Sequence, residues 1–393
     1  MTINERLCAR APVNGRHAMF VAGHSAATLA GVSVLKRGGS IIDAMISGSA
    51  ALTVTVGQAT SIGGDCFLLF HEAKTGRTVG LNASGTAPQG ATPERFADGM
   101  KIYGPLAPVV PGIVRVWDVM HRRYGTLPWR SLFDDAIALA EEYPVSHSLA
   151  ERFSSSLDRI KADSGCASVY MPNGRAIQIG DMLRQPALAR TLRTIADEGA
   201  DAFCRGAIAQ RIDEFFEERG GLIRASDLAA YDPLWTEPAI SDYRGHQVEV
   251  MPPNSLDVLL LMQLNGLSAL DSATLMENAG RRAGYQMSAL KAAAGLSKRW
   301  SADRRGGAGR RRAFDRRKDD GANAGRRVCS RRANTRAQHR RYRLPADRRR
   351  IRKCGEYGAE RVQRVRSRAP RSGDRHHVQQ PDARIHSPAR SSE

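Results

Sequence analysis

Hydrophobic periodicity stops near residue 300, and this boundary limits the part of the chain that can build a core. Residues 17–300 alternate apolar segments with turn signals, whereas RRGGAGRRRAFDRRKDD and the stretch after it hold few large apolar side chains. The charge changes at the same point: 29 of the 59 Lys and Arg residues and 10 of the 40 Asp and Glu residues lie in 301–393, so this stretch carries the whole net charge of +19. We expect a flexible N-terminus at 1–16, a folded domain at 17–300 and a disordered basic tail at 301–393.

The spacing of apolar side chains within residues 17–300 predicts a mixture of helices and strands. Ser40 and Asp43 form a candidate capping box at the start of a long and almost uncharged helix. The turn KTGR separates two apolar runs, which indicates a hairpin. The expected helices are 25–39, 40–57, two within 111–143, those in 187–219, 220–233 and 256–270, and the expected strands are 17–23, FLLFHE, TVGLNA and 246–255.

Cysteine usage and hydropathy favour a cytoplasmic location. The six cysteines form no CxxC pair, so we expect free thiols in a reducing compartment. The N-terminal segment MTINERLCARAPVNGR has no apolar core of signal-peptide length. Because no stretch of 18 apolar residues occurs, we expect no membrane partner.

A series of short motifs in residues 17–300 resembles the large-chain region of the γ-glutamyltransferase family. Each motif is weak alone, but together they keep the family's order along the domain. They are A-G-x-x-V-L-x-x-G-G at 30–39, I-D-A at 42–44, S-I-G-G-D-C-F at 61–67, T-A-P at 86–88, V-P-G at 110–112, Y-G-T-L-P-W at 124–129, the run from Gln185 to Leu192, D-A-F-C-R-G at 201–206, S-D-L-A-A-Y at 226–231, Y-R-G at 243–245 and M-P-P-N-S at 251–255.

This resemblance implies an α+β fold, the αββα sandwich of N-terminal-nucleophile hydrolases, in which two central sheets lie between helical layers. Family precursors cut themselves before a Thr, which then acts as the nucleophile with its own α-amine as base. The implied reaction is amide hydrolysis or γ-glutamyl or acyl transfer on a glutathione-type, small amide or peptide-like substrate, without cofactor or metal. The nucleophile and most of the site belong to the small chain, so residues 17–300 imply a sandwich that lacks the small-chain strands.

Three departures from the family pattern concern the site. Ser84 stands two residues before T-A-P, where glutamyl-specific members carry an Arg that grips the substrate α-carboxylate. A serine cannot make the two charge-assisted hydrogen bonds that an arginine makes to a carboxylate, so we expect another amide or acyl substrate rather than a γ-glutamyl one. Leu256-Asp257 replaces the family's Gly-Gly after P-P-x-S, and Thr335 lacks the strand that should follow a nucleophile.

The basic tail is predicted to be an out-of-frame translation. Reading residues 375–382 one base later admits G-I-T-F-N-N-R-M, which resembles the small-chain motif G-T-G-I-x-x-N-N-R-M, and 360–366 admits S-A-F-N-A-F-G. The same shift at Gln338-His339-Arg340 admits Ser-Thr. We therefore expect a frameshift between about residues 290 and 335, with the lost nucleophile codon near His339 and Arg340. The chain as written is expected to be uncleaved, inactive and poorly stable, with unpaired sheet edges.

Other chemistry-bearing residues have simpler interpretations. The GGDC loop before Cys66 is typical of a turn rather than of a phosphate loop or a cysteine nucleophile. His24 and His71 are more often structural, and His376-His377 lack the further ligands of a metal site. The alternative function is a basic-tailed protein that binds nucleic acid non-specifically through phosphates, although the tail has few aromatic residues for stacking and no known binding motif.

Overall fold

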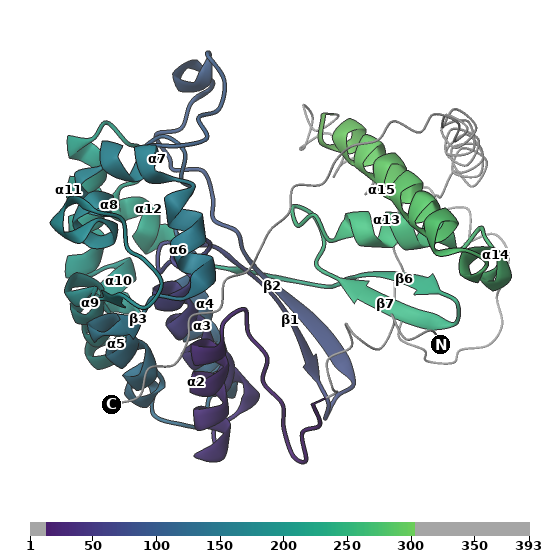
Figure 1. The fold of residues 1–393 in the computed structure, drawn as a ribbon, viewed down its shortest axis with the longest axis horizontal. Helices are drawn as coiled ribbons and strands as arrows, with labels where there is room; N and C mark the ends of the chain where they lie inside the picture. Colours follow the sequence, from purple (N-terminus) through teal and green to yellow (C-terminus); the bar gives the residue numbers. More distant parts are fainter. Residues whose placement is uncertain (1–12, 303–393) are drawn as a thin grey trace, which may run out of the picture. The chain divides into compact units, whose positions relative to one another are not determined.

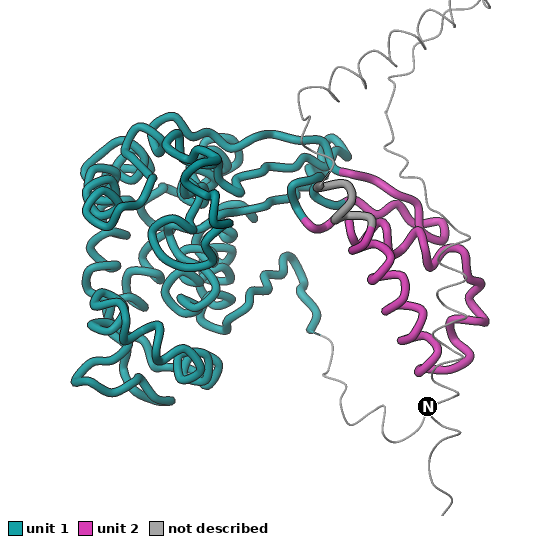
Figure 2. The backbone as a smooth tube through the Cα atoms, turned by 90° about the horizontal axis from the view of Figure 1, so that it is seen from above, with its two compact units in different colours: residues 1–238, 250–255 teal, residues 239–249, 256–393 magenta. Residues whose placement is uncertain are grey.

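The structure is a computed structural model that describes residues 13–302, with side chains to residue 295. It forms two compact units, which are described separately (Figure 2). Unit 1 comprises the described residues up to Pro238 together with Val250–Ser255, and unit 2 comprises Ala239–Glu249 and residues 256–302. Residues 303–393, with nearly all of the expected tail, lie outside the described part of the chain.

Unit 1 combines a set of helices with a small antiparallel sheet, so the fold is mixed α and β (Figure 1). Its helices are α2 (Ser25–Lys36), α3 (Ile41–Thr55), α4 (Ile113–Tyr124), α5 (Asp134–Glu141), α6 (His147–Ser154), α7 (Leu157–Ala162), α8 (Ser164–Tyr170), α9 (Pro186–Glu198), α10 (Asp201–Cys204), α11 (Ala207–Glu218) and α12 (Ala225–Ala230). These bounds confirm the expected helices up to residue 233. The helices α6 to α8, with the short strands β3 (Tyr143–Pro144) and β4 (Met182–Leu183), were not anticipated.

The three-stranded sheet has the order β1-β2-β5, with β2 in the middle. The strands β1 (Cys66–Glu72) and β2 (Arg77–Ala83) form the expected hairpin, and β5 (Leu234–Thr236) pairs with the other side of β2. In β1 the burial alternates along the strand, so one face contacts the helices and the other is exposed. The expected two-sheet sandwich stays a prediction.

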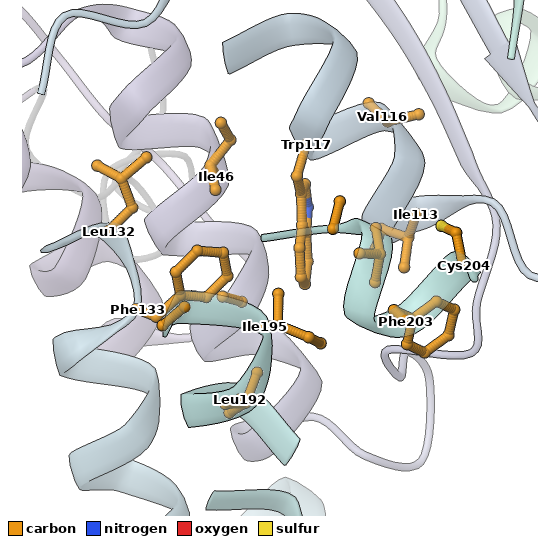
Figure 3. Packing of buried hydrophobic residues seen from close by; sticks show 14 of the residues in the cluster. Ile46, Ile113, Val116, Trp117, Leu132, Phe133, Leu192, Ile195, Phe203 and Cys204 are labelled. Carbon is orange, nitrogen blue, oxygen red and sulfur yellow. The ribbon is translucent and has the colours of Figure 1, made fainter. Parts of the chain in front are cut away.

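The main core lies between α3, α4, α9 and the inner face of the sheet. Trp117 on α4 packs near Phe133, with ring centroids 5.8 Å apart, and both are fully buried (Figure 3). Ile46 from α3 and Ile195 from α9 belong to the same cluster. The indole N–H of Trp117 is satisfied by the Ser49 hydroxyl at 3.1 Å. The almost uncharged sequence of α3 is therefore explained by burial on several sides.

Asp43 joins α3 to the segment that follows α4. The predicted capping box is present: the Ser40 hydroxyl accepts from the Asp43 N–H, and Asp43 accepts from the Ser40 N–H. The same carboxylate oxygen, Oδ2, also accepts from the Thr126 N–H and hydroxyl and from the Leu127 N–H, at 2.7–3.1 Å. One buried side chain thus fixes both a helix start and the Y-G-T-L-P-W segment.

The predicted strand at 17–23 is wrong. This segment is irregular, and the Phe20 ring fills the space where α2 and α3 cross. A Cβ at either Gly31 or Gly48 would lie 2.4 Å from that ring. The apolar character of the segment therefore reflects one aromatic contact with two glycines rather than strand pairing.

Unit 2 consists of a two-stranded hairpin and three helices. Its elements are β6 (Ala239–Tyr243), β7 (His246–Val250), α13 (Val258–Leu267), α14 (Ser272–Met276) and α15 (Ala279–Ala302). Leu267, Leu275 and Ala289 form a small core, and the Ser241 hydroxyl donates to Asn265 across the hairpin and α13. The helix predicted at 256–270 is confirmed, and the strand predicted at 246–255 ends at Val250.

Candidate functional site

Three of the family-like motifs meet at the end of β2. The carbonyl of Gly64 accepts from the backbone N–H groups of Gly112 and Ile113, at 3.0 and 3.1 Å. The carbonyl of Thr86, in T-A-P, accepts from the N–H of Val110, in V-P-G. The motifs S-I-G-G-D-C-F, T-A-P and V-P-G therefore form one backbone-bonded unit around the strand end.

The GGDC loop is a turn, as the sequence indicated. The N–H groups of Gly63 and Gly64 both bond to Ser61, one to its hydroxyl and one to its carbonyl. Because Gly64 in turn accepts from the N-terminal N–H groups of α4, these donors are not free to hold a phosphate. Burial and the neighbouring Asp65 raise the pKa of Cys66 to about 11, which leaves a thiol and no nucleophilic thiolate at neutral pH.

Ser84 lies directly after β2 in a cluster of three uncharged side chains. Its N–H donates to Asn82 Oδ1 at 3.0 Å, and its hydroxyl accepts from Asn254 Nδ2 at 2.8 Å. Asn82 Nδ2 donates to Asn254 Oδ1 at 2.8 Å. All three residues belong to unit 1. Each side chain fixes the orientation of another, so the cluster is ordered without any ion pair among its members.

The loop next to Ser84 is shaped by a close backbone approach. Gly85 has φ +77°, and a Cβ there would lie 2.5 Å from both the Val109 side chain and the Val110 carbonyl. The Gly85 N–H donates to the Tyr231 hydroxyl at 3.3 Å. Burial raises the pKa of Tyr231, so it stays a neutral phenol. Only glycine fits this position, which explains S-G-T-A-P as a local sequence.

The cluster presents hydrogen-bond donors without positive charge. Since the Ser84 oxygen already accepts from Asn254, its own O–H is free to donate to a ligand. Asn254 is exposed, while Ser84 and Asn82 are half-buried. Such donors can bind a carbonyl or another neutral acceptor. They do not include a charged guanidinium, which would bind a carboxylate tightly through two hydrogen bonds.

The two histidines weighed as catalytic candidates have structural contacts. His24 Nδ1 accepts from the Ala26 N–H at the start of α2, and its Nε2 lies 2.8 Å from the Tyr143 hydroxyl. His71 Nδ1 lies 3.0 Å from the Thr78 hydroxyl on the neighbouring strand. Neither histidine is among the residues of the Ser84 cluster.

The remaining candidates divide between the described and undescribed parts. Leu256 is 72% exposed and Asp257 precedes α13. Thr335, the predicted nucleophile position at His339 and Arg340, and His376-His377 lie outside the described residues. In the part of the chain with described side chains, no three His, Cys, Asp or Glu residues gather as a metal site would require.

Sequence reasoning identified Ser84 but missed its two amide partners. Asn254 is 170 residues away along the chain and reaches Ser84 because Val250–Ser255 belongs to unit 1. Met251 of this segment lies over the sheet, since a Cβ at Gly80 would be 3.0 Å from its sulfur. The motif M-P-P-N-S was a usable signal, because its asparagine is the residue that touches Ser84.

Comparison with known proteins places these motifs in one family. The family described as Gamma-glutamyltranspeptidase matches residues 27–310. The chain belongs to this family. Its matched region is the large-chain region, as the motif order indicated. In the described residues no helix has both the length and the apolar character needed to cross a membrane.

The relatives include both hydrolases and acylases. The glutathione hydrolase proenzyme of Bacillus subtilis strain 168 is 32% identical over 272 residues, covering 67% of this chain and 46% of that protein. The acylase ACY 1 proenzyme of Pseudomonas sp. strain SE83 is also 32% identical, covering 68% of this chain and 50% of its own length. The chain thus spans about half the length of these relatives.

Solved structures of the family have the same fold. The Helicobacter pylori gamma-glutamyltranspeptidase is similar with a TM-score of 0.68 and 31% identity, over 72% of this chain and 84% of that chain. The cephalosporin acylase of Bacillus halodurans gives 0.65 and 33%, over 72% of this chain and 56% of that chain. The fold is therefore of the N-terminal-nucleophile hydrolase type over about 72% of the chain.

Proposed function

We propose that residues 17–300 are the large-chain domain of an amide hydrolase or acyltransferase whose acyl donor is not γ-glutamyl. The observation that supports this is the neutral cluster of Ser84, Asn82 and Asn254 at the position where glutamyl-specific members carry an Arg. Hydrogen bonds to a charged group contribute about 1.5–3 kcal/mol, more than those between neutral groups. A donor with a free α-carboxylate would lose that contribution here.

Similarity alone does not choose between the two substrate classes. The hydrolase and acylase relatives are equally identical to this chain, at 32%. The Ser84 cluster favours the acylase side, because a hydroxyl donor and an amide suit a neutral acyl chain. The substrate we propose is therefore a small amide without an α-carboxylate next to its acyl side chain.

The chain as written is proposed to lack activity. The catalytic Thr of the family belongs to the small chain, and its codon is predicted to be out of frame near His339 and Arg340. The decisive experiment is the nucleotide sequence from about codon 285 onward. We expect the +1 frame to encode Ser-Thr, a strand and G-x-G-I-T-F-N-N-R-M. Stop codons in that frame would reject the frameshift.

Enzyme assays test the substrate class. The purified chain should give one band and no hydrolysis, whereas two self-cleaved bands would contradict the proposed inactivity. With the frame restored, the enzyme should prefer aliphatic acyl anilides, which have no carboxylate on the acyl group, to γ-glutamyl anilide. The Ser84→Arg variant should shift this preference toward γ-glutamyl by about 10–100-fold, since each 1.4 kcal/mol is a factor of ten. An unchanged ratio would refute the role of Ser84.

Nucleic-acid binding stays a second prediction. It rests on the net charge of +19 in a segment outside the described residues. Binding that is steeply salt-dependent but not sequence-selective would reflect phosphate attraction alone. Sequence-selective binding by residues 301–393 would support an evolved role.

A further inference from the structure

Asp65 lies beside Ser84, at the end of the β1–β2 hairpin that is remote from its turn. The last pair of the hairpin ladder is Cys66 with Ala83. Asp65 directly precedes β1 and Ser84 directly follows β2, so extending the antiparallel register by one position sets these two residues opposite each other. A carboxylate therefore stands next to the uncharged Ser84 cluster.

The side chains of Asp65 and Ser84 belong to the same face of the hairpin. Successive side chains of a strand point to opposite faces. Ala83 is fully buried in the main core, so Asn82 and Ser84 on either side of it belong to the outer face. Cys66 packs against the same core, and Asp65 before it is exposed. The carboxylate, the hydroxyl and the amide of Asn82 therefore share the outer face.

The negative charge of Asp65 acts on the loop that carries Ser84. Burial raises the pKa of Tyr231, and the charge of Asp65 raises it further. The Tyr231 hydroxyl accepts from the N–H of Gly85, the residue after Ser84, so this charge reaches the group that holds the loop. Among the described side chains, none donates a hydrogen bond to the Asp65 carboxylate or forms an ion pair with it. Its charge therefore remains available to a ligand.

We propose that Asp65 determines specificity by favouring an acyl donor with an ammonium group at the end of its acyl chain and disfavouring one with a carboxylate there. This inference rests on the proposed function and narrows its substrate class. A 4-aminobutanoyl amide fits, because it has the reach of a γ-glutamyl amide and keeps the ammonium but lacks the α-carboxylate. Its ammonium would meet an opposite charge at Asp65, whereas a carboxylate would meet a like charge. Phe67, which is 38% exposed and pairs with Asn82, offers an apolar surface to the methylene chain.

The charge beside Ser84 is measurable on the full chain as written, without turnover. Ser84→Cys places a thiol in the cluster, and peptide mass spectrometry follows its modification by a cationic and by an anionic methanethiosulfonate, each rate divided by that of free cysteine. Asp65→Asn in this background should lower the ratio of cationic to anionic rates about fivefold, as expected for one exposed charge. The matched control is Glu72→Gln, which removes a charge about 23 Å further along β1, beyond the Debye length of about 10 Å, and should leave the ratio unchanged. A ratio that Asp65→Asn does not lower would overturn the proposal.

The enzyme with the frame restored gives a second readout on 4-aminobutanoyl, butanoyl and glutaryl anilides. We expect kcat/KM to be highest for the 4-aminobutanoyl and lowest for the glutaryl compound, and Asp65→Asn should reduce the ratio between these two at least about fivefold. Glu72→Gln should leave that ratio unchanged. A preference for γ-glutamyl over butanoyl anilide would reject the proposed function. A preference for butanoyl over γ-glutamyl, with equal rates on the 4-aminobutanoyl and glutaryl compounds, would reject the role of Asp65 alone.

Discussion

Replacing Asp43 by alanine is expected to be among the most destabilising single changes in unit 1. The carboxylate is fully buried, and its Oδ2 accepts from three backbone N–H groups, those of Ser40, Thr126 and Leu127, and from the Thr126 hydroxyl. Each donor left without a partner costs about 1–3 kcal/mol when buried. Ser40 and Leu127 are half-buried and Thr126 is exposed, and the Ser40 N–H also donates to the Thr126 hydroxyl oxygen, so we take the low end for each N–H and add the lost cap. The expected cost of Asp43→Ala is about 3–5 kcal/mol.

Two further variants separate the contributions. Asp43→Asn keeps one acceptor oxygen but removes the charge, so it should cost about 1–2 kcal/mol. Ser40→Ala removes the reciprocal cap alone and should cost about 1 kcal/mol. Urea unfolding followed by tryptophan fluorescence measures all three, because Trp117 lies in the same core cluster as α3. A cost below about 1 kcal/mol for Asp43→Ala would refute the assignment of Asp43 as the junction of these segments.

The pH dependence provides an independent check. Burial opposes ionisation of Asp43, yet the hydrogen bonds from Thr126, Ser40 and Leu127 outweigh it and hold the pKa of its carboxyl below the usual value. The ionised group therefore stabilises the fold above about pH 4, and this contribution is lost as the pH falls through the lowered pKa. The wild type should lose stability in that acid range, and Asp43→Asn should lose less.

Three other outcomes follow from the described contacts. Burial lowers the pKa of His24, and protonation would block the Nδ1 that accepts from the Ala26 N–H. The free energy of unfolding should therefore be highest above about pH 6.5 and should fall as the pH drops through the lowered pKa. His24→Asn, which keeps an acceptor at the helix start, should reduce this loss in urea titrations. The pKa of Cys66 is raised to about 11, so only about one in a thousand of these side chains is a thiolate at pH 8. Iodoacetamide should therefore modify Cys66 far more slowly in the native chain than in urea. Equal rates would contradict its burial. Trp117→Ala should cost about 3–5 kcal/mol in the same unfolding assay, and a cost under 1 kcal/mol would show that the core can close around the space.

Local signals in the sequence predicted most elements of unit 1. The capping box of Ser40 and Asp43 marked the start of α3, and KTGR marked the turn between β1 and β2. These signals act within a few residues, so they can be read without knowing the fold. The apolar run at 17–23 was wrongly predicted as a strand because its apolar character serves a contact with residues far along the chain. Phe20 packs into spaces left by Gly31 and Gly48.

The site shows the same division between local and distant causes. Ser84 was found because it departs from a short motif, but its partner Asn254 could not be placed without the path of the chain. Periodicity records whether a side chain is buried, whereas a polar cluster depends on which segments meet. The one sequence clue to Asn254 was its position inside M-P-P-N-S.

Because β5 follows β2 by about 150 residues in the chain, β2 lacks one of its two neighbouring strands for part of protein synthesis. On a ribosome the hairpin of β1 and β2 emerges early, but Asn82 pairs with Leu234, about 150 residues later. At a synthesis rate of about 5–20 residues per second, β5 is synthesised roughly 8–30 s after β2. Met251 and Asn254, which contact the same hairpin at Gly80 and Asn82, arrive later still. During synthesis both edges of an apolar hairpin are therefore open to chaperones and to neighbouring nascent chains.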